Sequence, residues 1–416
     1  MLTLSSKKLL VVGLGKSGQA VAKRAADLGA DVCTYEDTPG TSHQAPGTDF
    51  DLVVTSPGIR FNHPVLRLSA KEGWPVISEV EFAYQLLEPG FIIGITGTNG
   101  KTTVVEMLSH FFKLSGKPYT LAGNVGTPLS AFEEIKGPLI LELSSFQLHF
   151  IDKFRANIGA ILNVTEDHLD WHCCMGQYLK DKLRLFENQQ QGDVAIVNGD
   201  DAYLGEQSLP ERALTFSVKG LADFYLKDGY LRVGNEKIAA SDELRLKGSH
   251  NIANALAAAA CAKEAGLDLD LIREGLQTFE GLKHRLQLVG IKNEVSFYND
   301  SKSTNPDSTY KAIESFKAPL ILIIGGRNKG NNFAMMKKYL DNPVKELVLY
   351  GEAAFEIKEQ VGAGHISQAV EEAVAEAARL SKSGDTVLFS PGCASFDLFD
   401  NYAQRGDAFV KAVECL

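Results

Sequence analysis

The sequence is poor in cysteine and has no long apolar segment. Six cysteines are spread over its 416 residues, from Cys33 to Cys415, and no Cys-x-x-Cys pair occurs. This excludes a dense disulfide framework, so we predict free thiols in a reducing compartment. No window of about 18 apolar residues exists, and we expect no membrane-spanning helix. Lys16 ends the first apolar run too early for a secretory signal peptide, so we expect a cytoplasmic protein.

The sequence also lacks a basic excess. It has 42 Lys and Arg against 52 Asp and Glu, a net charge of −10. Proteins that bind nucleic acid or membrane surfaces generally carry a surplus of basic residues, so we expect neither partner. Local basic groups can still bind anionic small molecules. With 44% apolar residues, the chain can form ordinary cores in roughly two to four domains, most simply three.

Short apolar runs alternate with helical patterns along most of the chain. This alternation predicts βαβ units with parallel sheets, and hence the α/β class. We predict strands at residues 9–12, 31–35, 51–54, 91–95, 138–143, 158–163, 294–299, 319–324, 345–350 and 385–389. We predict helices at 17–28, 101–114 and 251–265, and a small antiparallel patch at 211–240. Turn signals at 88–90 and 281–283 divide the chain into three predicted domains, residues 1–89, 90–283 and 284–416.

The most specific motif is residues 96–103 (TGTNGKTT), which lie between an apolar run and a predicted helix. Glycines let backbone amides turn toward phosphate oxygens, and a helix N-terminus favours negative charge. Lys101 can bridge the terminal phosphates, and the hydroxyl of Thr102 or Thr103 can reach Mg²⁺. Ile95 replaces the first glycine of the usual pattern, but the context still predicts a nucleoside triphosphate site. Its predicted residues are Gly97, Thr98, Asn99, Gly100, Lys101, Thr102 and Thr103.

A second glycine loop, residues 13–18 (GLGKSG), matches the pattern GxGxxG. Glu36 and Asp37 follow about 20 residues later, as for an acid that binds a ribose. Alone, this loop is compatible with NAD or FAD, with any nucleotide diphosphate, or with a purely structural turn. A hydride-transfer enzyme would not need the triphosphate loop, so the two loops together do not favour an oxidoreductase.

Six further segments accompany the phosphate loop in a fixed order. They are residues 141–148 (LELSSFQL), 163–168 (NVTEDH), 248–255 (GSHNIANA), 284–285 (HR), 299–305 (NDSKSTN) and 390–397 (SPGCASFD). Together with the loop they closely resemble the Mur ligases, over essentially the whole chain. The resemblance implies an ATP-dependent ligase that adds D-glutamate to UDP-N-acetylmuramoyl-L-alanine through an acyl phosphate, in peptidoglycan precursor biosynthesis.

The resemblance also implies an architecture. The first domain would be Rossmann-like and hold the UDP end of the substrate, which argues against NAD at the GxGxxG loop. The central domain would be P-loop ATPase-like, and the C-terminal domain would be Rossmann-like, bind D-glutamate and close onto ATP. The implied cofactors are ATP and two Mg²⁺ ions, the implied partners are small-molecule substrates alone, and the implied state is a monomer.

The resemblance assigns roles to particular residues. Lys101, His168 and Lys182 would be catalytic. Mg²⁺ would be held by Thr102, Glu142, His168 and Lys182, the lysine being carbamylated by CO₂. Carbamylation turns a cation into an anionic oxygen ligand, and it needs a neutral amine whose pKa is lowered by burial or a nearby cation. Nucleotide contacts would come from Asn251, Asn254, Arg285 and Asp300.

The substrate contacts follow in the same way. The UDP substrate would contact Gly15, Ser17, Asp37, Thr38, Ser56 and Asn124. D-Glutamate would contact Lys302, Thr304, Lys329, Ser395 and Tyr402. The family often has Arg where Pro39 follows Asp37 and Thr38, and often has Phe at the position of Tyr402, so these contacts depart from its pattern.

Simpler interpretations remain for some of these residues. Lys182 lies between Lys180 and Arg184 on a predicted helix, so it could belong to a solvated basic face. Glu142 could be an ordinary carboxylate at a strand end. His168 and His172 have the spacing of a zinc pair, but no glutamate follows His168, so the HExxH pattern fails.

Three other functions compete with this interpretation. The chain could be another ATP-dependent amino-acid ligase, such as the L-alanine-adding or folylpolyglutamate relative. The folyl enzymes lack a separate UDP-binding domain, whereas about 90 residues precede the phosphate loop here. An NAD-dependent oxidoreductase and a non-catalytic nucleotide-binding regulator are the remaining alternatives.

Overall fold

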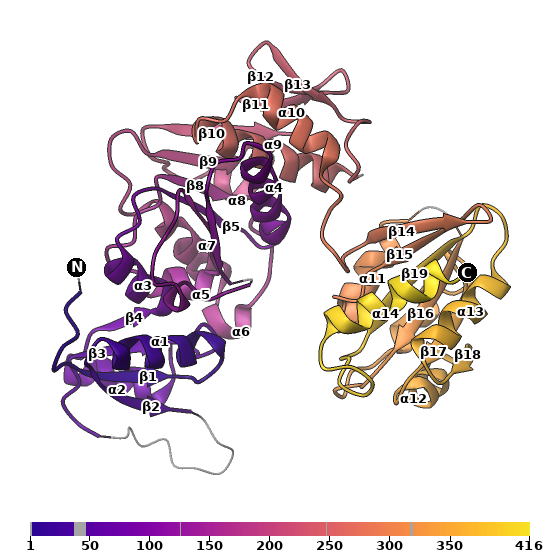
Figure 1. The fold of residues 1–416 in the computed structure, drawn as a ribbon, viewed down its shortest axis with the longest axis horizontal. Helices are drawn as coiled ribbons and strands as arrows, with labels where there is room; N and C mark the ends of the chain where they lie inside the picture. Colours follow the sequence, from indigo (N-terminus) through magenta and orange to yellow (C-terminus); the bar gives the residue numbers. More distant parts are fainter. Residues whose placement is uncertain (1, 37–46, 125, 247, 317–318) are drawn as a thin grey trace. The chain divides into compact units, whose positions relative to one another are not determined.

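The computed structural model describes residues 2–36, 47–124, 126–246, 248–316 and 319–416. The chain divides into two compact units, Met1–Phe279 and Glu280–Leu416, each described here by itself (Figure 1). Both units alternate strands and helices, so the predicted α/β class is confirmed. No helix in these described ranges is long and apolar enough to cross a membrane. All six cysteines are free thiols, as predicted.

A four-stranded parallel sheet opens the first unit, in the order β2–β1–β3–β4. Its elements are β1 (Lys8–Val12), α1 (Lys16–Asp27), β2 (Asp31–Tyr35), β3 (Leu52–Thr55), α2 (Pro64–Glu72), β4 (Val76–Ser78) and α3 (Glu79–Leu87). Leu9 and Val11 of β1 belong to one apolar cluster, while Leu10 and Val12 belong to another. Successive side chains of a strand point to opposite faces, so both faces of this sheet are covered.

A nine-stranded sheet forms the rest of the first unit, in the order β13–β12–β11–β10–β9–β8–β5–β7–β6. Its strands are β5 (Ile92–Thr96), β6 (Thr120–Gly123), β7 (Leu139–Glu142), β8 (Ile158–Ile161), β9 (Val194–Asn198), β10 (Ala213–Ser217), β11 (Phe224–Lys227), β12 (Tyr230–Val233) and β13 (Glu236–Ala240). Its helices are α4 (Lys101–Leu114), η1 (Leu129–Ala131), α5 (Ser145–His149), α6 (Leu169–His172), α7 (Met175–Leu183), η2 (Arg184–Phe186), α8 (Ala202–Gly205), α9 (Ser249–Glu264) and α10 (Leu269–Thr278).

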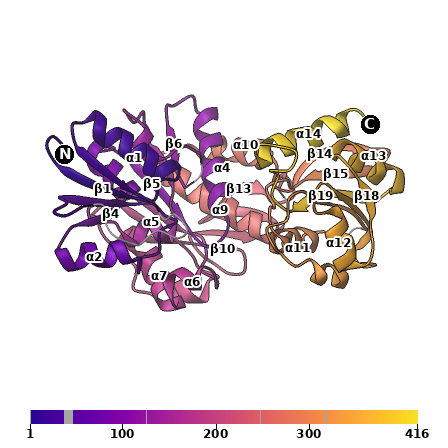
Figure 2. The same ribbon diagram turned by 90° about the horizontal axis from the view of Figure 1, so that it is seen from below.

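The predicted antiparallel patch at 211–240 is confirmed for β11 to β13 and was wrong for β10. Strand β10 pairs in parallel with both β9 and β11, and only the pairs β11–β12 and β12–β13 are antiparallel. All four strands extend the central sheet. Helix α9 packs along strands β8 to β11 and against α4 (Figures 1 and 2). It therefore covers the place where β10 joins β9 in the sheet, a pairing that the sequence did not predict.

Two buried glutamates of α3 join the two sheets of the first unit. The carboxylate of Glu81 accepts hydrogen bonds from three successive backbone amides, those of Asp152, Lys153 and Phe154, at 2.9, 3.0 and 2.8 Å. Glu79 accepts one from the amide of Ser130 at 2.7 Å. Burial raises the pKa of Glu79. Because these carboxylates satisfy backbone amides of the central part of the chain, they fix α3 against it.

The second unit has a six-stranded sheet in the order β14–β15–β19–β16–β17–β18, in which only the edge strand β14 is antiparallel. Its strands are β14 (Gln287–Lys292), β15 (Val295–Asn299), β16 (Leu320–Gly325), β17 (Val344–Tyr350), β18 (His365–Ser367) and β19 (Thr386–Gly392). Its helices are α11 (Pro306–Glu314), η3 (Ala334–Tyr339), α12 (Ala354–Val361), α13 (Val370–Leu380) and α14 (Tyr402–Glu414). In open sheets of this kind, ligands gather at the carboxyl ends of the parallel strands.

Candidate active site

The phosphate loop connects β5 to the N-terminus of α4. Gly97 and Gly100 have φ angles of +151° and +86°, in the region that favours glycine. The ammonium group of Lys101 folds back onto the loop and donates hydrogen bonds to the backbone oxygens of Gly97 and Thr98, at 2.7 and 2.9 Å. The loop therefore has the backbone turn and the placed cation that a polyphosphate requires.

Asn163, just after β8, holds the loop from the neighbouring strand. Its side-chain oxygen accepts from the amide of Asn99 at 2.8 Å, and its side-chain nitrogen donates to the Asn99 carbonyl at 3.0 Å. The backbone amide of Thr98 also donates to the Asn163 carbonyl at 2.9 Å. Asn163 belongs to the motif at residues 163–168, for which the sequence predicted no role at this position. The structure shows that its side chain fixes the loop.

Asn254 of α9 lies directly against the loop. A Cβ atom added to Gly100 would lie 2.3 Å from the side-chain oxygen of Asn254, so no larger residue fits at position 100 unless the asparagine moves. The side-chain nitrogen of Asn254 donates to the side-chain oxygen of Asn251 at 3.4 Å. The two asparagines predicted to contact the nucleotide are therefore adjacent, and Asn254 borders the phosphate loop.

Glu142 lies at the carboxyl end of β7, next to the phosphate loop. It is paired with Ile95 of β5, the second residue before Gly97. The side chain is buried, and its Oε1 accepts from the side-chain nitrogen of Asn124 at 3.3 Å. Its other oxygen, Oε2, is buried without a hydrogen-bond partner in the described structure. A buried carboxylate oxygen with no partner is costly, and an oxygen-seeking cation such as Mg²⁺ would satisfy it.

Lys182 is buried on α7, so the interpretation of a solvated basic face was wrong for this residue. Its side chain is 1% exposed, and its nitrogen lies 4.3 Å from the centre of the Tyr178 ring. Burial lowers the pKa of Lys182 well below its usual range, and the positive charge of Lys101 lowers it further, against the opposing effect of Asp167 and Asp181. A lysine in this environment carries a neutral amine more readily than an exposed one.

Tyr178 connects α7 to the phosphate loop. Its hydroxyl lies 3.1 Å from the hydroxyl of Thr98. Burial raises the pKa of Tyr178 to about 12, so the phenol stays protonated at neutral pH. One turn of α7 therefore brings the loop, Tyr178 and the amine of Lys182 into one site, although nothing in the sequence singled out Tyr178.

His168 occupies an exposed position beside this site. Its φ angle is +53°, and its side chain is 48% exposed. The ring lies 4.9 Å from the Phe146 ring and 6.4 Å from the Tyr178 ring, measured between centroids. The imidazole therefore lies beside Tyr178, which itself contacts Thr98 and Lys182. It also remains accessible to a ligand.

A buried hydrogen-bond network behind the site escaped the sequence analysis. Nδ1 of His172 lies 2.9 Å from one oxygen of Asp181, and Nδ1 of His149 lies 2.9 Å from the other. Nε2 of His172 lies 2.9 Å from the hydroxyl of Ser145. Burial alone would raise the pKa of Asp181, but hydrogen bonds from His149 and His172 outweigh it and lower the pKa. The network joins α5, which follows Glu142, to α7, which carries Lys182.

The pairing of His168 with His172 in a zinc site is not supported by this geometry, because His172 is buried and bonded to Asp181 and Ser145. Among the described residues no group of three or more His, Cys, Asp and Glu side chains could hold a metal ion. A magnesium site here would therefore need oxygen ligands of other kinds beside Glu142 and His168. Hydroxyl, phosphate and modified-lysine oxygens could supply them.

The second glycine loop packs tightly against the turn after β3. The hydroxyl of Ser56 donates to the backbone oxygen of Gly13 at 2.7 Å. A Cβ at Gly18 would lie only 1.8 Å from that same oxygen. Gly15 caps the N-terminus of α1, and Ser17 lies in its first turn. Ser56, which was predicted to contact the UDP substrate, thus makes a hydrogen bond within the protein.

A cavity of about 340 Å³ opens beside this turn, lined by residues 58–60 and 62–64. Trp171 of α6 donates from its indole nitrogen to the backbone oxygen of Ile59 at 3.1 Å, which connects the turn to the segment carrying His168. Asn124 is exposed beside Glu142. Asp37 and Thr38, also predicted to contact UDP, lie outside the described residues.

The five residues predicted to contact D-glutamate lie in segments at the carboxyl ends of β15, β16 and β19. The hydroxyl of Ser301 donates to the backbone oxygen of Tyr402 at 2.8 Å, and the amide of Gly392 donates to the carbonyl of Ser303 at 3.0 Å. The ammonium group of Lys329 lies 5.6 Å from the Phe396 ring centre. The segments of Lys302, Thr304, Lys329, Ser395 and Tyr402 therefore converge. Ser395 is buried, whereas Lys329 and Tyr402 are exposed.

Asp300, which was predicted to contact the nucleotide, is bonded within the protein instead of being open to a ligand. It is buried, and one of its oxygens accepts from the hydroxyls of Ser303 and Ser390, at 2.6 and 2.7 Å. Burial raises its pKa to about 6. These bonds join the ends of β15 and β19, so Asp300 has a structural role within its unit. Arg285, the other predicted nucleotide contact of this unit, is exposed.

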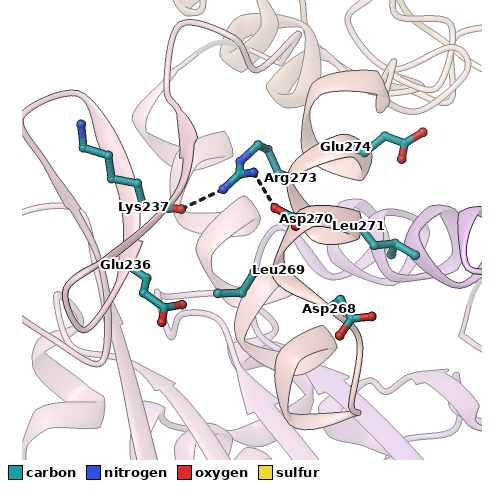
Figure 3. Close-up of a pocket in the computed structure, with 8 residues that line it drawn as sticks. All are labelled: Glu236, Lys237, Asp268, Leu269, Asp270, Leu271, Arg273 and Glu274. Carbon is teal, nitrogen blue, oxygen red and sulfur yellow. Dashed lines mark hydrogen bonds and ion pairs between the residues drawn. The ribbon is translucent and has the colours of Figure 1, made fainter.

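A larger groove, of about 830 Å³, lies away from these residues, between β13 and the start of α10 (Figure 3). Arg273 bridges it, donating to the backbone oxygen of Lys237 at 3.2 Å and to the carboxylate of Asp270 at 2.7 Å. Because its arginine is already bonded to the protein and no glycine loop borders it, the groove is not the candidate active site.

Comparison with known proteins assigns a family. Residues 95–262 match the Mur ligase middle domain, and residues 284–393 match the glutamate ligase domain of Mur ligases. A UDP-N-acetylmuramoylalanine–D-glutamate ligase from Caldanaerobacter subterraneus is 37% identical, over 99% of this chain and 98% of the relative. One from Desulfitobacterium hafniense is 39% identical over the same shares. The chain belongs to the Mur ligase family.

Solved Mur ligase structures share the fold over the whole chain. UDP-N-acetylmuramate-alanine ligase MurC from Thermotoga maritima matches with a TM-score of 0.61 and 20% identity, covering 98% of this chain and 99% of that one. MurF ligase from Thermotoga maritima, solved in complex with ADP, matches with a TM-score of 0.58 and 16% identity, covering 100% and 99%. The three-domain Mur ligase fold therefore describes this chain, with its three predominantly parallel sheets.

Proposed function

We propose that this protein is the ATP-dependent ligase that joins D-glutamate to UDP-N-acetylmuramoyl-L-alanine in peptidoglycan precursor biosynthesis. The observation that carries the proposal is the whole-chain similarity to relatives of that name, at 37% and 39% identity. The phosphate loop with Lys101, Glu142 and Lys182 around it supports the same reaction, because amide formation from a carboxylate needs prior activation by ATP.

The first step activates the substrate carboxylate. The alanyl carboxylate attacks the γ-phosphate of ATP, which forms an acyl phosphate and releases ADP. Repulsion between the anionic groups is the main obstacle to this attack. Lys101, at the positive end of the 14-residue helix α4, opposes this repulsion, and the backbone amides of the loop hold the phosphates in place.

The unpartnered Oε2 of Glu142 makes a magnesium site beside the loop chemically reasonable. Thr102, Glu142, His168 and a carbamylated Lys182 would hold up to two Mg²⁺ ions, which when bound would neutralise phosphate charge. Carbamylation joins the neutral lysine amine to CO₂, with loss of one proton, and gives a carbamate. Burial beside Lys101 favours the neutral amine that this step requires.

In the second step the amine of D-glutamate attacks the acyl carbon, and phosphate leaves. Lys302, Thr304, Lys329, Ser395 and Tyr402 would bind the amino acid, because a dicarboxylate needs cations and hydroxyl donors. His168 would stabilise the oxyanion of the tetrahedral intermediate. The nucleotide would be contacted by Asn251, Asn254 and Arg285. Asp300 would act indirectly, by shaping the segment in which it lies.

The three domains would each bind a different part of the substrates. Residues 1–89 form a Rossmann-like domain that binds the UDP end through Gly15, Ser17, Asp37, Thr38, Ser56 and Asn124. Residues 90–283 form the P-loop ATPase-like domain, and residues 284–416 form a Rossmann-like domain that closes onto ATP, excluding water from the acyl phosphate. The enzyme acts as a monomer in the cytoplasm, where its ATP and nucleotide-linked substrate are available.

A product assay tests the proposal. Purified protein is incubated with UDP-N-acetylmuramoyl-L-alanine, ATP and Mg²⁺, and with D-glutamate, L-glutamate or L-alanine, and the nucleotide product is weighed by mass spectrometry. The proposal requires a product with D-glutamate alone. A product with another amino acid, but not with D-glutamate, would favour another Mur ligase activity. Oxidation of added NADH without ATP turnover would favour an oxidoreductase.

A further inference from the structure

A fully buried arginine lies next to the carboxyl ends of β15 and β19. Arg405, in the first turn of α14, has an exposed fraction of 0%. Its Nε donates to the hydroxyl of Ser301 at 3.0 Å, and one terminal nitrogen donates to the Ser301 carbonyl at 2.8 Å. The other terminal nitrogen donates to the Cys393 carbonyl at 2.9 Å. The guanidinium group thus joins the start of α14 to the segment after β15, about a hundred residues earlier in the chain, and to the segment after β19.

Each of these segments carries a residue proposed to bind D-glutamate. Ser301 precedes Lys302, and Cys393 lies two residues before Ser395. Tyr402 is joined to the same centre, because the hydroxyl of Ser301 accepts from Arg405 and donates to the backbone oxygen of Tyr402 at 2.8 Å. One side chain therefore determines the relative positions of the backbones that carry three of the proposed contacts.

Among the described residues, no carboxylate is hydrogen-bonded to Arg405. All three of its hydrogen bonds go to neutral oxygens, two carbonyls and one hydroxyl. Asp397, the acidic residue of the same segment as Ser395, instead accepts from the backbone amide of Glu352 at 3.3 Å. The charge of Asp397 acts on Tyr350 and Cys393 together with that of Arg405, so it offsets part of the buried positive charge. A bound dicarboxylate at the ends of these strands would add further negative charge.

We propose that Arg405 is a positioning residue for D-glutamate: it fixes the 301–304, 393–395 and 402 segments in one arrangement and contributes positive potential to the site. The proposal rests on the function proposed above. It assigns to Arg405 no contact with the substrate. Arginine suits this position because its planar fork donates from three nitrogens in fixed directions, whereas the single ammonium of lysine cannot reproduce that geometry.

The test compares two nucleophiles on the same enzyme. D-Glutamate needs the amino-acid site, whereas hydroxylamine, a small neutral nucleophile, can trap the acyl phosphate as a hydroxamate with release of phosphate and needs no such site. Both rates are measured for the wild type, Arg405→Lys, Arg405→Met, Ser301→Ala and a control, Arg379→Lys, which alters an exposed arginine of the same unit. Circular dichroism and thermal unfolding show which variants fold.

The wild type must first form the D-glutamate product, because without that product the proposed function fails and this inference fails with it. We then expect Arg405→Lys to raise the KM for D-glutamate by about ten-fold or more, with hydroxamate formation and the KM for ATP within about two-fold of the wild type. Arg405→Met, which also removes the charge, should raise the KM further.

Ser301→Ala keeps the arginine and its charge, and we expect a rise in the D-glutamate KM of about three-fold or more. If both Arg405 variants fail to fold, the D-glutamate KM of Ser301→Ala tests the proposal in their place. An unchanged D-glutamate KM in the folded variants would overturn the proposal. Equal losses with D-glutamate and hydroxylamine would overturn it too, because they would indicate a general structural role. Arg379→Lys should match the wild type in every assay.

Discussion

The amine nitrogen of Lys182 lies 4.3 Å from the centre of the Tyr178 ring, on the same buried face of α7. Tyr178 in turn contacts Thr98 of the phosphate loop. A buried lysine amine beside a second cation is disfavoured in its charged form. This relationship supports the proposal that Lys182, although it lies in a basic-looking stretch of sequence, reacts with CO₂ to supply an oxygen ligand.

Replacing Lys182 by alanine should remove most ligase activity, because the proposed carbamate ligand is lost. We expect a decrease in kcat of about a hundred-fold or more, as for the loss of a group acting on developing charge. Short carboxylic acids, such as acetate, should restore part of the activity. The matched control is Lys180→Ala, which alters an exposed lysine of the same helix. Full activity of Lys182→Ala without added acid would contradict the assigned role.

Gly100→Ala should weaken nucleotide binding while leaving the chain folded. Its φ angle is +86°, and the new Cβ would lie 2.3 Å from the Asn254 side chain, so both the loop and the asparagine must shift. We expect the Kd for ATP, measured by calorimetry, to rise by about ten-fold or more. Gly90→Ala is the control, because a Cβ there meets nothing within 4 Å. Wild-type affinity in Gly100→Ala would show that the loop does not bind phosphate in this form.

Glu81→Ala should destabilise the first unit. It would leave three backbone amides, the part-buried ones of Asp152 and Lys153 and the buried one of Phe154, without the carboxylate that they donate to. We expect the free energy of unfolding to fall by about 3 kcal/mol, measured by denaturant titration. Glu134→Ala, at an exposed position, should change it little. A loss in Glu81→Ala no greater than in the control would mean that α3 is held by apolar contacts alone.

Asp300 should make stability depend on pH. Its pKa is about 6 in the folded protein against an ordinary value of 3.8, so the unfolded chain releases this proton at lower pH. Its contribution to stability is therefore complete below pH 3.8 and is lost as the pH rises through 6. Relative to Asp300→Asn, the wild type should lose roughly 1 kcal/mol of unfolding free energy between about pH 5 and about pH 8.

The control for this measurement is Asp400→Asn, which alters an exposed carboxylate of the same unit. Its difference from the wild type should stay constant across the same pH range. A constant difference for Asp300→Asn as well would show that Asp300 titrates as it does in the unfolded chain.

Local features could be predicted from the sequence because neighbouring residues determine them. The phosphate loop, β1 and α4 follow directly from glycine placement and apolar runs, and the ends of most predicted strands agree with the structure within a few residues. The parallel pairing of β10 with β9 could not be predicted in this way, since it depends on α9, which comes later in the chain and packs on both strands.

The surroundings of the site residues were harder to predict for the same reason. Lys182 has charged neighbours in the sequence, and only the packing of α7 shows that its side chain is buried. His149, His172 and Asp181 meet across three helices, and Arg405 meets Ser301 across about a hundred residues of chain. No periodicity or motif connects such residues, because their contacts depend on tertiary structure.

In the proposed reaction, ATP activates the substrate carboxylate before the amine attacks. The most direct measurement uses UDP-N-acetylmuramoyl-L-alanine with ¹⁸O in its alanyl carboxylate, together with ATP, Mg²⁺ and D-glutamate, and determines the isotope content of the released phosphate. We expect each released phosphate to carry one oxygen from the carboxylate. Phosphate released without the label, alongside the D-glutamate product, would contradict the proposed reaction.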